Sequence, residues 1–201
     1  MIKEILKPGL LLLIFTIISI FFVSWTQNTT QEQIQHNEEQ LLIKRLAELV
    51  SNYDNDILKD KYTQLLTLHG VHQSINIYPA KRNGQVFAHL IEHTYPNGYN
   101  GNILLLTGIS SDQTLLGVRV IAHKETPGLG DKIETRKSDW IKKFTGLSLS
   151  NPGPDNWKVK RDGGVFEAFT GATITPRAIV TASHQVLELF NEQALLDKSA
   201  K

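Results

Sequence analysis

The segment at residues 170–176, TGATITP, places three threonines, one glycine and one proline directly before an apolar helical pattern. A threonine here can cap the helix, or its hydroxyl can carry a covalently attached group. Pro176 suits the first helical position, which predicts Thr175 as the N-cap. The small residues Gly171 and Ala172 imply a bulky neighbour, and a phosphate there would meet free N–H groups at the positive end of the helix dipole. The segment therefore predicts a phosphate site that contains a threonine hydroxyl.

The segment at residues 123–132, HKETPGLGDK, is the second candidate for chemistry. It follows an apolar strand-like run, and its proline and glycines are typical of a tight connecting turn. The same glycines would let backbone amides approach a planar ligand closely, with Leu129 against the face of that ligand. Taken alone, this segment favours neither interpretation over the other.

Several other kinds of site lack their sequence signatures. His69 and His72 are three residues apart, but the glycine between them and the missing carboxylate argue against a metal site. No dinucleotide-binding glycine motif, phosphate-loop lysine or nucleophile elbow occurs. The chain has no cysteine, which excludes disulfides, thiolate zinc sites and iron–sulfur clusters. Its 21 basic and 20 acidic residues nearly cancel, so we expect no nucleic-acid partner.

The N-terminal residues 9–25 form an apolar run, with no charge between Lys7 and Glu32. Seventeen residues give about 25 Å of helix, close to the roughly 30 Å of a bilayer core. Pro8 and residues 26–28 complete a membrane span. A cleaved signal peptide is the alternative, but no small-residue cleavage pattern follows the run. We therefore expect a retained membrane anchor.

The orientation of this anchor is predicted from the charges that flank it. Lys3 and Lys7 lie on the short N-terminal side, and the other flank is polar and acidic. The excess of positive charge predicts a cytoplasmic N-terminus, which places the remaining ~170 residues outside the cytoplasm. In a Gram-negative bacterium that compartment is the periplasm.

The rest of the chain predicts one α+β domain, with a mainly antiparallel sheet flanked by helices. Short turn-rich connections favour hairpins over a βαβ repeat. Residues 1–28 are assigned to the N-terminus and anchor, 29–70 to an amphipathic helical linker region and 71–201 to the domain. The expected helices cover residues 31–51, 56–68, 138–144 and 176–191. The expected strands cover residues 74–80, 85–94, 102–109 and 114–123, with a short one in 157–164.

Together, these segments resemble a known family of membrane flavoproteins. DGG…FTGATITPRA, HKETPGLGDKI and GYNGNI at 98–103 are similar to the covalent-flavin domain of the G subunit of the Rnf (or Rsx) electron-transport complex. The resemblance extends over the whole chain, including the anchor and the order of the motifs. The C subunit of the sodium-pumping NADH:quinone oxidoreductase is similar but is typically longer.

The resemblance implies a covalently bound cofactor, FMN, joined through its phosphate to the threonine that ends TGAT, here Thr173. It also implies that a separate flavin transferase makes this bond from FAD with a metal ion, and that Asp162 belongs to the signal which the transferase reads. The residues expected at the phosphate end are Gly171, Ala172 and Thr175. The residues expected to line the ring are Glu125, Thr126, Gly128, Leu129 and Gly130.

The function implied is that of a membrane-anchored electron carrier. FMN would relay electrons among the other membrane subunits of a complex that couples ferredoxin and NAD(H) oxidoreduction to ion movement across the bacterial inner membrane. The flavin supplies the redox chemistry, so no residue is expected to act as a general acid or base and no resident metal is expected. The alternative from another class is an anchored binding or scaffold module without a cofactor.

Overall fold

The computed structural model describes residues 2–192, apart from the side chains of residues 2–5, 32 and 35. Two parts lie outside this description: Met1, assigned above to the N-terminus, and residues 193–201, assigned above to the domain. Contacts divide the chain into residues 1–43 and 44–201, and each unit is described separately. The predicted boundaries at residues 28 and 70 concern the anchor and linker, and they stay predictions.

The first unit consists of α1 (Ile2–Leu49), whose last turns belong to the second unit. The helix continues without a break through the predicted anchor into the region expected to be amphipathic. Its apolar side chains from Leu10 to Val23 are exposed, and the helix is long and apolar enough to cross a membrane. The hydroxyls of Thr16 and Ser19 donate to carbonyls one turn earlier, at 2.8 Å each, so both are satisfied within the helix.

The second unit is built on a five-stranded antiparallel sheet with its strands in chain order. Short hairpins join the strands, as the turn signals predict, and the four main predicted strands are confirmed. The strands are β1 (Tyr62–Leu68), β2 (Val71–Arg82), β3 (Gln85–Gly98), β4 (Gly101–Ser110) and β5 (Leu115–Ala122).

The helix predicted over residues 56–68 is wrong, because β1 occupies its second half. Side chains along β1 alternate between half-buried and exposed, which is the period of a strand. His69 and Gly70 form the two-residue turn to β2, with φ of 58° and 76°. Positive φ at both positions is typical of the hairpin turn that fits strand twist.

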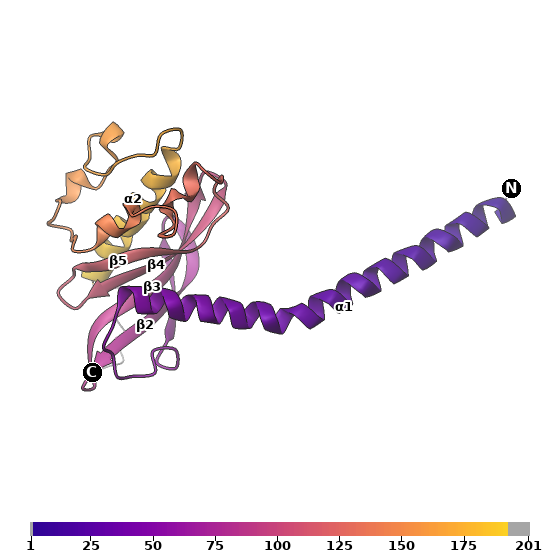
Figure 1. The fold of residues 1–201 in the computed structure, drawn as a ribbon, viewed down its shortest axis with the longest axis horizontal. Coiled ribbons are helices and arrows are strands. Elements are labelled where there is room, and N and C mark those ends of the chain that lie inside the picture. Colours follow the sequence, from indigo (N-terminus) through magenta and orange to yellow (C-terminus); the bar gives the residue numbers. More distant parts are fainter. Residues whose placement is uncertain (1, 193–201) are drawn as a thin grey trace. The chain divides into compact units, whose positions relative to one another are not determined.

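The two faces of the sheet are covered by different helices. Helix α2 (Ile174–Asn191) packs against β3 and β4 and closes the main hydrophobic core on one face (Figure 1). On the other face the end of α1 is buried through Leu46 and Leu49. Gly108 and Gly117 make room for Leu49, since a Cβ added at either glycine would touch its side chain. The fold is therefore α+β, as predicted.

Between β5 and α2 the chain contains four short 3₁₀ helices, η1 (Gly130–Ile133), η2 (Trp140–Phe144), η3 (Pro154–Asn156) and η4 (Lys160–Asp162). The helix predicted at residues 138–144 is present as η2. The strand predicted within residues 157–164 is wrong, because only an isolated bridge joins Val159 to Phe166. Buried aromatic rings from this segment pack against one another and stabilise it. These rings belong to Trp140, Phe144, Trp157, Phe166 and Phe169.

Candidate functional site

The glycine-rich segment after β5 is a tight turn. The carbonyl of Thr126 accepts hydrogen bonds from the N–H groups of Leu129 (3.2 Å) and Gly130 (3.1 Å). Pro127 and Gly128 occupy its centre, and Gly128 has φ of 78°, as a type II turn requires. The turn presents Leu129 to solvent, where 42% of this residue is exposed. Both interpretations of the segment are therefore compatible, because a turn can also form a wall of a site.

The TGAT segment forms a second turn of the same kind. The N–H of Ala172 donates to the carbonyl of Phe169 at 3.1 Å, and Gly171 between them has φ of 81°. A Cβ added at Gly171 would lie 3.4 Å from Cδ2 of Leu129. The two glycine-rich turns, about 40 residues apart in sequence, therefore touch each other at Gly171 and Leu129.

The start of α2 differs from its prediction. The helix begins at Ile174, and Thr173 occupies the N-cap position without a side-chain cap hydrogen bond. Thr175 is thus not the N-cap; it lies in the first turn, is 1% exposed and donates its hydroxyl to Oε2 of Glu125. Pro176 is accepted within the first turn because the N–H that it lacks has no helical partner there.

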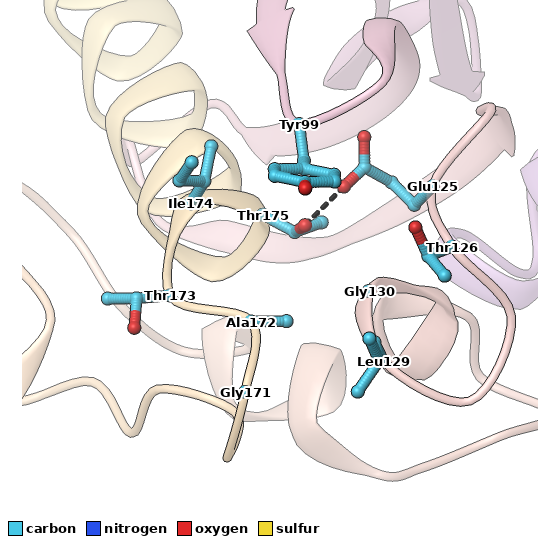
Figure 2. A pocket seen from close by; sticks show the side chains of 10 residues that line it. All are labelled: Tyr99, Glu125, Thr126, Leu129, Gly130, Gly171, Ala172, Thr173, Ile174 and Thr175. Atoms are coloured by element: carbon cyan, nitrogen blue, oxygen red, sulfur yellow. Dashed lines mark hydrogen bonds between the residues drawn. The ribbon is translucent and has the colours of Figure 1, made fainter.

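These segments enclose a pocket of about 260 Å³. In Figure 2, Tyr99 lies beside the hydrogen bond from Thr175 to Glu125, with Leu129 and Ala172 on the other side in this view. The volume is slightly below the roughly 300–1,000 Å³ of most small-molecule sites, so the pocket fits part of a cofactor and leaves the rest exposed. The lining residues are Tyr99, Glu125, Thr126, Leu129, Gly130, Gly171, Ala172, Thr173, Ile174 and Thr175.

The pocket contains every predicted site residue except Gly128, whose role is to form the turn. Sequence reasoning missed Tyr99 and Ile174. Tyr99 lies in GYNGNI, at the connection between β3 and β4, and 63% of it is exposed. An exposed aromatic residue in a glycine-rich turn was the available signal. Ile174 directly follows TGAT and is also exposed.

Glu125 connects three segments of the pocket wall. It is 4% exposed; its Oε2 accepts the hydroxyl of Thr175, and its Oε1 accepts the backbone N–H of Asn100 at 3.1 Å. The side-chain amide of Asn100 also donates to the hydroxyl of Thr126 at 3.1 Å. A Cβ added at Gly98 would lie 2.8 Å from Oε1 of Glu125. The pocket is thus organised around one buried carboxylate group.

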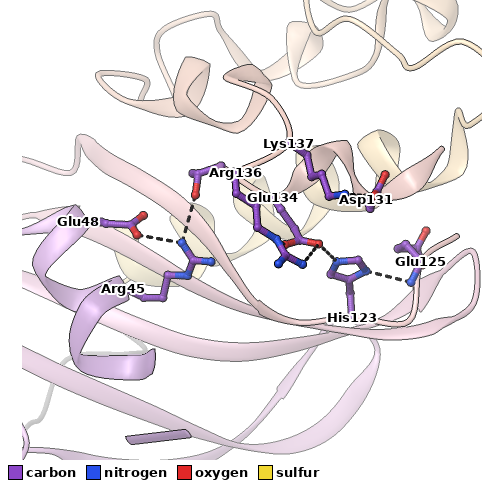
Figure 3. A network of polar contacts seen from close by, with 9 residues as sticks. Arg45, Glu48, His123, Glu125, Asp131, Glu134, Arg136 and Lys137 are labelled. Carbon is purple, nitrogen blue, oxygen red and sulfur yellow. Dashed lines mark hydrogen bonds and ion pairs between the residues drawn. The ribbon is translucent and has the colours of Figure 1, made fainter. Parts of the chain in front are cut away.

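A network of polar contacts holds the loop that carries Glu125 (Figure 3). Nδ1 of His123 accepts the backbone N–H of Glu125 at 3.0 Å, so the ring proton must be on Nε2, which lies 3.0 Å from Oε1 of Glu134. Arg136 pairs with the same carboxylate of Glu134. Arg136, and to a lesser extent His123, lower the pKa of Glu134 below its usual range. The loop that carries Glu125 is therefore held by a charge-compensated neighbour.

Asp162, which the resemblance assigns to recognition by the transferase, is not among the residues that line the pocket. It makes a two-pronged ion pair with Arg177 of α2, at 2.6 and 2.9 Å. This pairing lowers the pKa of the Asp162 carboxyl. The ion pair thus joins the two ends of residues 162–177, the segment that contains Thr173.

A second polar cluster, away from the lining of the pocket, links α2 to the sheet. Oγ1 of Thr107 lies 2.9 Å from Nε2 of His93, and Nδ1 of His93 lies 3.0 Å from Nε2 of His69. Nδ1 of His69 in turn hydrogen-bonds with Oε1 of Gln185. Burial lowers the pKa of His93 well below its usual value, and the pKa of His69 is lowered for the same reason. His72 instead faces Thr67, so the HGVH histidines do not converge.

No group of three or more potential metal-ligating side chains occurs within residues 2–192. The pocket instead offers a half-buried threonine hydroxyl, exposed apolar side chains and the N-terminus of a helix. This set of groups fits a flavin mononucleotide, whose ring is apolar on both faces and whose phosphate is anionic.

Comparisons with known proteins agree with this chemistry. Residues 98–188 match the family model of the FMN-binding domain, and residues 1–49 match that of the RnfG N-terminal region. The class of protein is therefore an FMN-binding domain joined to a long N-terminal helix.

Three relatives define the family more closely, and each is named as the G subunit of an ion-translocating oxidoreductase complex. The protein of Pseudoalteromonas atlantica is 48% identical over 98% of this chain and 94% of its own length. That of Vibrio cholerae is 43% identical (96% and 93%), and that of Pseudomonas aeruginosa is 41% identical (96% and 93%). The chain belongs to this family of G subunits. Their name favours the Rnf resemblance over that to the C subunit of the sodium-pumping enzyme.

Proposed function

We propose that this chain is a membrane-anchored flavoprotein subunit that relays electrons through FMN bound covalently to Thr173, within an ion-translocating ferredoxin/NAD(H) oxidoreductase complex. Membership of the G-subunit family and the FMN-binding domain support the assignment to such a complex. The observation that carries the proposal is the state of the Thr173 hydroxyl. It lines the pocket and has no hydrogen-bond partner among the residues that the structure describes.

The other two threonines of the segment are less suitable for attachment. Thr175 is buried, and its hydroxyl is engaged by Glu125. Thr170 is exposed, but it lies outside the lining of the pocket. Thr173 is half-buried, with its hydroxyl at the start of α2, where a phosphoester would lie beside unpaired backbone N–H groups and the positive end of the helix dipole. Position and availability therefore both favour Thr173.

The remaining lining residues would hold and orient the cofactor. Leu129 and Tyr99 offer apolar surface to an isoalloxazine ring, and the two type II turns bring backbone close to it. Gly171 and Ala172 keep the space beside the phosphate free of bulky side chains. Bound FMN supplies the electron-transfer chemistry, so the protein contributes binding, orientation and electrostatics. No residue needs to transfer a proton to a substrate.

The proposal includes a location and two kinds of partner. The N-terminal helix anchors the chain in the bacterial inner membrane with the N-terminus in the cytoplasm, which places the FMN-binding domain in the periplasm or its equivalent. The partners are the other membrane subunits of the complex and, during maturation, a flavin transferase. A C-terminal reporter that matures only outside the cytoplasm should be active. A reporter active in the cytoplasm would reverse the proposed orientation.

The experiment uses the full chain, produced with and without a flavin transferase. After denaturing electrophoresis, the band should fluoresce under ultraviolet light only when the transferase is present. Thr173→Ala should abolish this fluorescence, whereas Thr173→Ser, which keeps a hydroxyl, should retain part of it. A wild-type band that stays dark with an active transferase would support a cofactor-free scaffold module instead.

A further inference from the structure

The carboxylate of Glu125 is a buried charge without a cation beside it. Both of its oxygens accept hydrogen bonds from neutral donors, the hydroxyl of Thr175 and the backbone N–H of Asn100. Within residues 2–192, no lysine, arginine or histidine side chain forms an ion pair with it. Burying a carboxylate costs free energy unless hydrogen bonds and opposite charge compensate it. Here only the hydrogen bonds are present.

Other acidic residues of the same loop are compensated by cations. Nζ of Lys137 lies 3.4 Å from the carboxylate of Asp131, and Glu134 pairs with Arg136 and also hydrogen-bonds with His123. These two acidic residues do not line the pocket, whereas Glu125 does. The carboxylate left without a cation is thus the one that faces the candidate cofactor site.

Two glycines hold this charge in place. A Cβ added at Gly98 would lie 2.8 Å from Oε1 of Glu125, and one added at Gly130 would lie 3.0 Å from Oε2. The backbone therefore approaches the carboxylate closely from two directions and restricts its movement away from the pocket. A fixed charge of this kind acts strongly on neighbouring charges, because it is shielded less than an exposed group.

We propose that Glu125 lowers the reduction potential of the flavin by placing an uncompensated negative charge in the wall of its site. This inference rests on the proposed function, because it requires FMN in the pocket. Adding an electron to a group in this pocket brings more negative charge next to the carboxylate, which disfavours the reduced form. Glu125 is thus a potential-setting residue, and its hydrogen bonds with Thr175 and Asn100 position it for that role.

The test is a spectroelectrochemical titration of the full, flavin-loaded chain in detergent. Glu125→Gln keeps the shape and removes the charge, so it should raise the midpoint potential. At a fixed applied potential the ratio of reduced to oxidised flavin should increase on the order of tenfold, the effect of one charge in a protein site. Glu125→Asp, which keeps the charge, should stay closer to wild type even though it alters packing.

Glu134→Gln is the matched control, because it removes a charge from the same loop that Arg136 already compensates. Its shift should be clearly smaller than that of Glu125→Gln. Equal shifts in the two variants, or an unchanged or lower potential in Glu125→Gln, would overturn the inference. If Glu125→Gln incorporates too little flavin, Thr175→Val, which removes a donor to the carboxylate, should lower the potential; a rise would also overturn it.

Failure of the inference can be distinguished from failure of the proposed function. A wild-type chain that takes up no flavin would contradict the proposed function itself. A wild-type chain that binds flavin, with a potential independent of the charge at residue 125, would contradict only the role of Glu125. Thermal unfolding of each variant without flavin verifies that the domain is folded.

Discussion

Helix α2 is connected to the sheet side of the domain by two polar clusters that differ in character. In its first turn, Thr175 meets Glu125 in the wall of an open pocket. About three turns later, Gln185 begins a chain through His69 and His93 to Thr107. The histidine cluster is uncharged, because burial lowers the pKa of both imidazoles and its other members are a threonine and a glutamine. The pocket cluster, in contrast, contains a carboxylate.

The surroundings of the two clusters differ in the same sense. His93 and Thr107 are fully buried, and both ring nitrogens of His93 have partners. At the pocket, Tyr99 and Leu129 remain largely exposed beside the polar groups. One helix thus makes a chain of buried hydrogen bonds to the sheet along its length and a hydrogen bond in the wall of the candidate cofactor site at its start. Changes in the histidine cluster should therefore affect unfolding, and changes at the pocket should affect the flavin.

Removal of His93 should give the largest effect on stability. His93→Ala leaves a cavity and removes the partners of Thr107 and His69, so the free energy of unfolding should fall by about 3 kcal/mol. Flavin attachment at low temperature should persist. His72→Ala, which removes an exposed side chain from β2, should change the free energy of unfolding by less than about 0.5 kcal/mol. Denaturant unfolding measures both, and similar values for the two variants would refute the distinction.

Stability should also fall as the pH is lowered below about 6.5. Burial lowers the pKa of His69 and His93 and lowers that of His89 to about 4, so these rings stay neutral in the folded protein while the unfolded chain takes up protons. Each ring should contribute up to about 1.4 kcal/mol per pH unit, starting near pH 6.5 and ending at its own folded pKa. Unfolding measured at pH 7.5, 6.5 and 5.5 should show the loss. A flat profile, or an unchanged slope in His93→Leu, would contradict this origin.

Substitutions at two neighbouring glycines separate the shape of the pocket from turn formation. A Cβ at Gly130 would lie 2.8 Å from Oγ1 of Thr175, so Gly130→Ala should displace the Thr175–Glu125 contact at a cost of about 1–2 kcal/mol. The flavin absorption spectrum should change with it. Gly128→Ala should cost about 1 kcal/mol through its positive φ and leave the spectrum unchanged, because a Cβ there meets nothing within 4 Å. Identical flavin absorption spectra in both variants would indicate that residues 123–132 form only a connecting turn and do not contact the flavin.

The smallest effect on stability is expected for the ion pair between Asp162 and Arg177. A double-mutant cycle of Asp162→Asn and Arg177→Gln should give only a small coupling free energy, because water screens this exposed pair. If the transferase reads Asp162 directly, Asp162→Asn should slow flavin attachment while Arg177→Gln leaves the rate unchanged. Equal slowing in both single variants and in the double variant would show that the ion pair, and not Asp162 alone, is required.

Much of the fold was predictable because local signals decide it. Alternating apolar residues and glycine-rich turns predict β2 to β5, and the period of α2 is clear from residue 176 onward. The helix predicted over residues 56–68 failed because short apolar runs fit either period, and the tight turn at His69 and Gly70 decides in favour of a strand. Likewise, the position of Pro176 allowed several starts for α2 within one turn.

The candidate site shows the same limit at longer range. The motif resemblance brought TGAT and ETPGLG into one hypothesis, and the structure brings them together in one pocket. The partner of Thr175 is 50 residues away in sequence, so its engagement by Glu125 could not be derived from the cap pattern. Tyr99 and His93 were missed for the same reason, because their neighbours come from distant segments.

Peptide mass spectrometry of the flavin-loaded chain tests the central claim most directly. Trypsin cleaves after Arg161 and Arg177, which releases residues 162–177 as one peptide with all three candidate threonines. We predict that this peptide carries one FMN minus water, and that fragmentation assigns the added mass to Thr173. Added mass on Thr170 or Thr175, or flavin still attached in Thr173→Ala, would contradict the account.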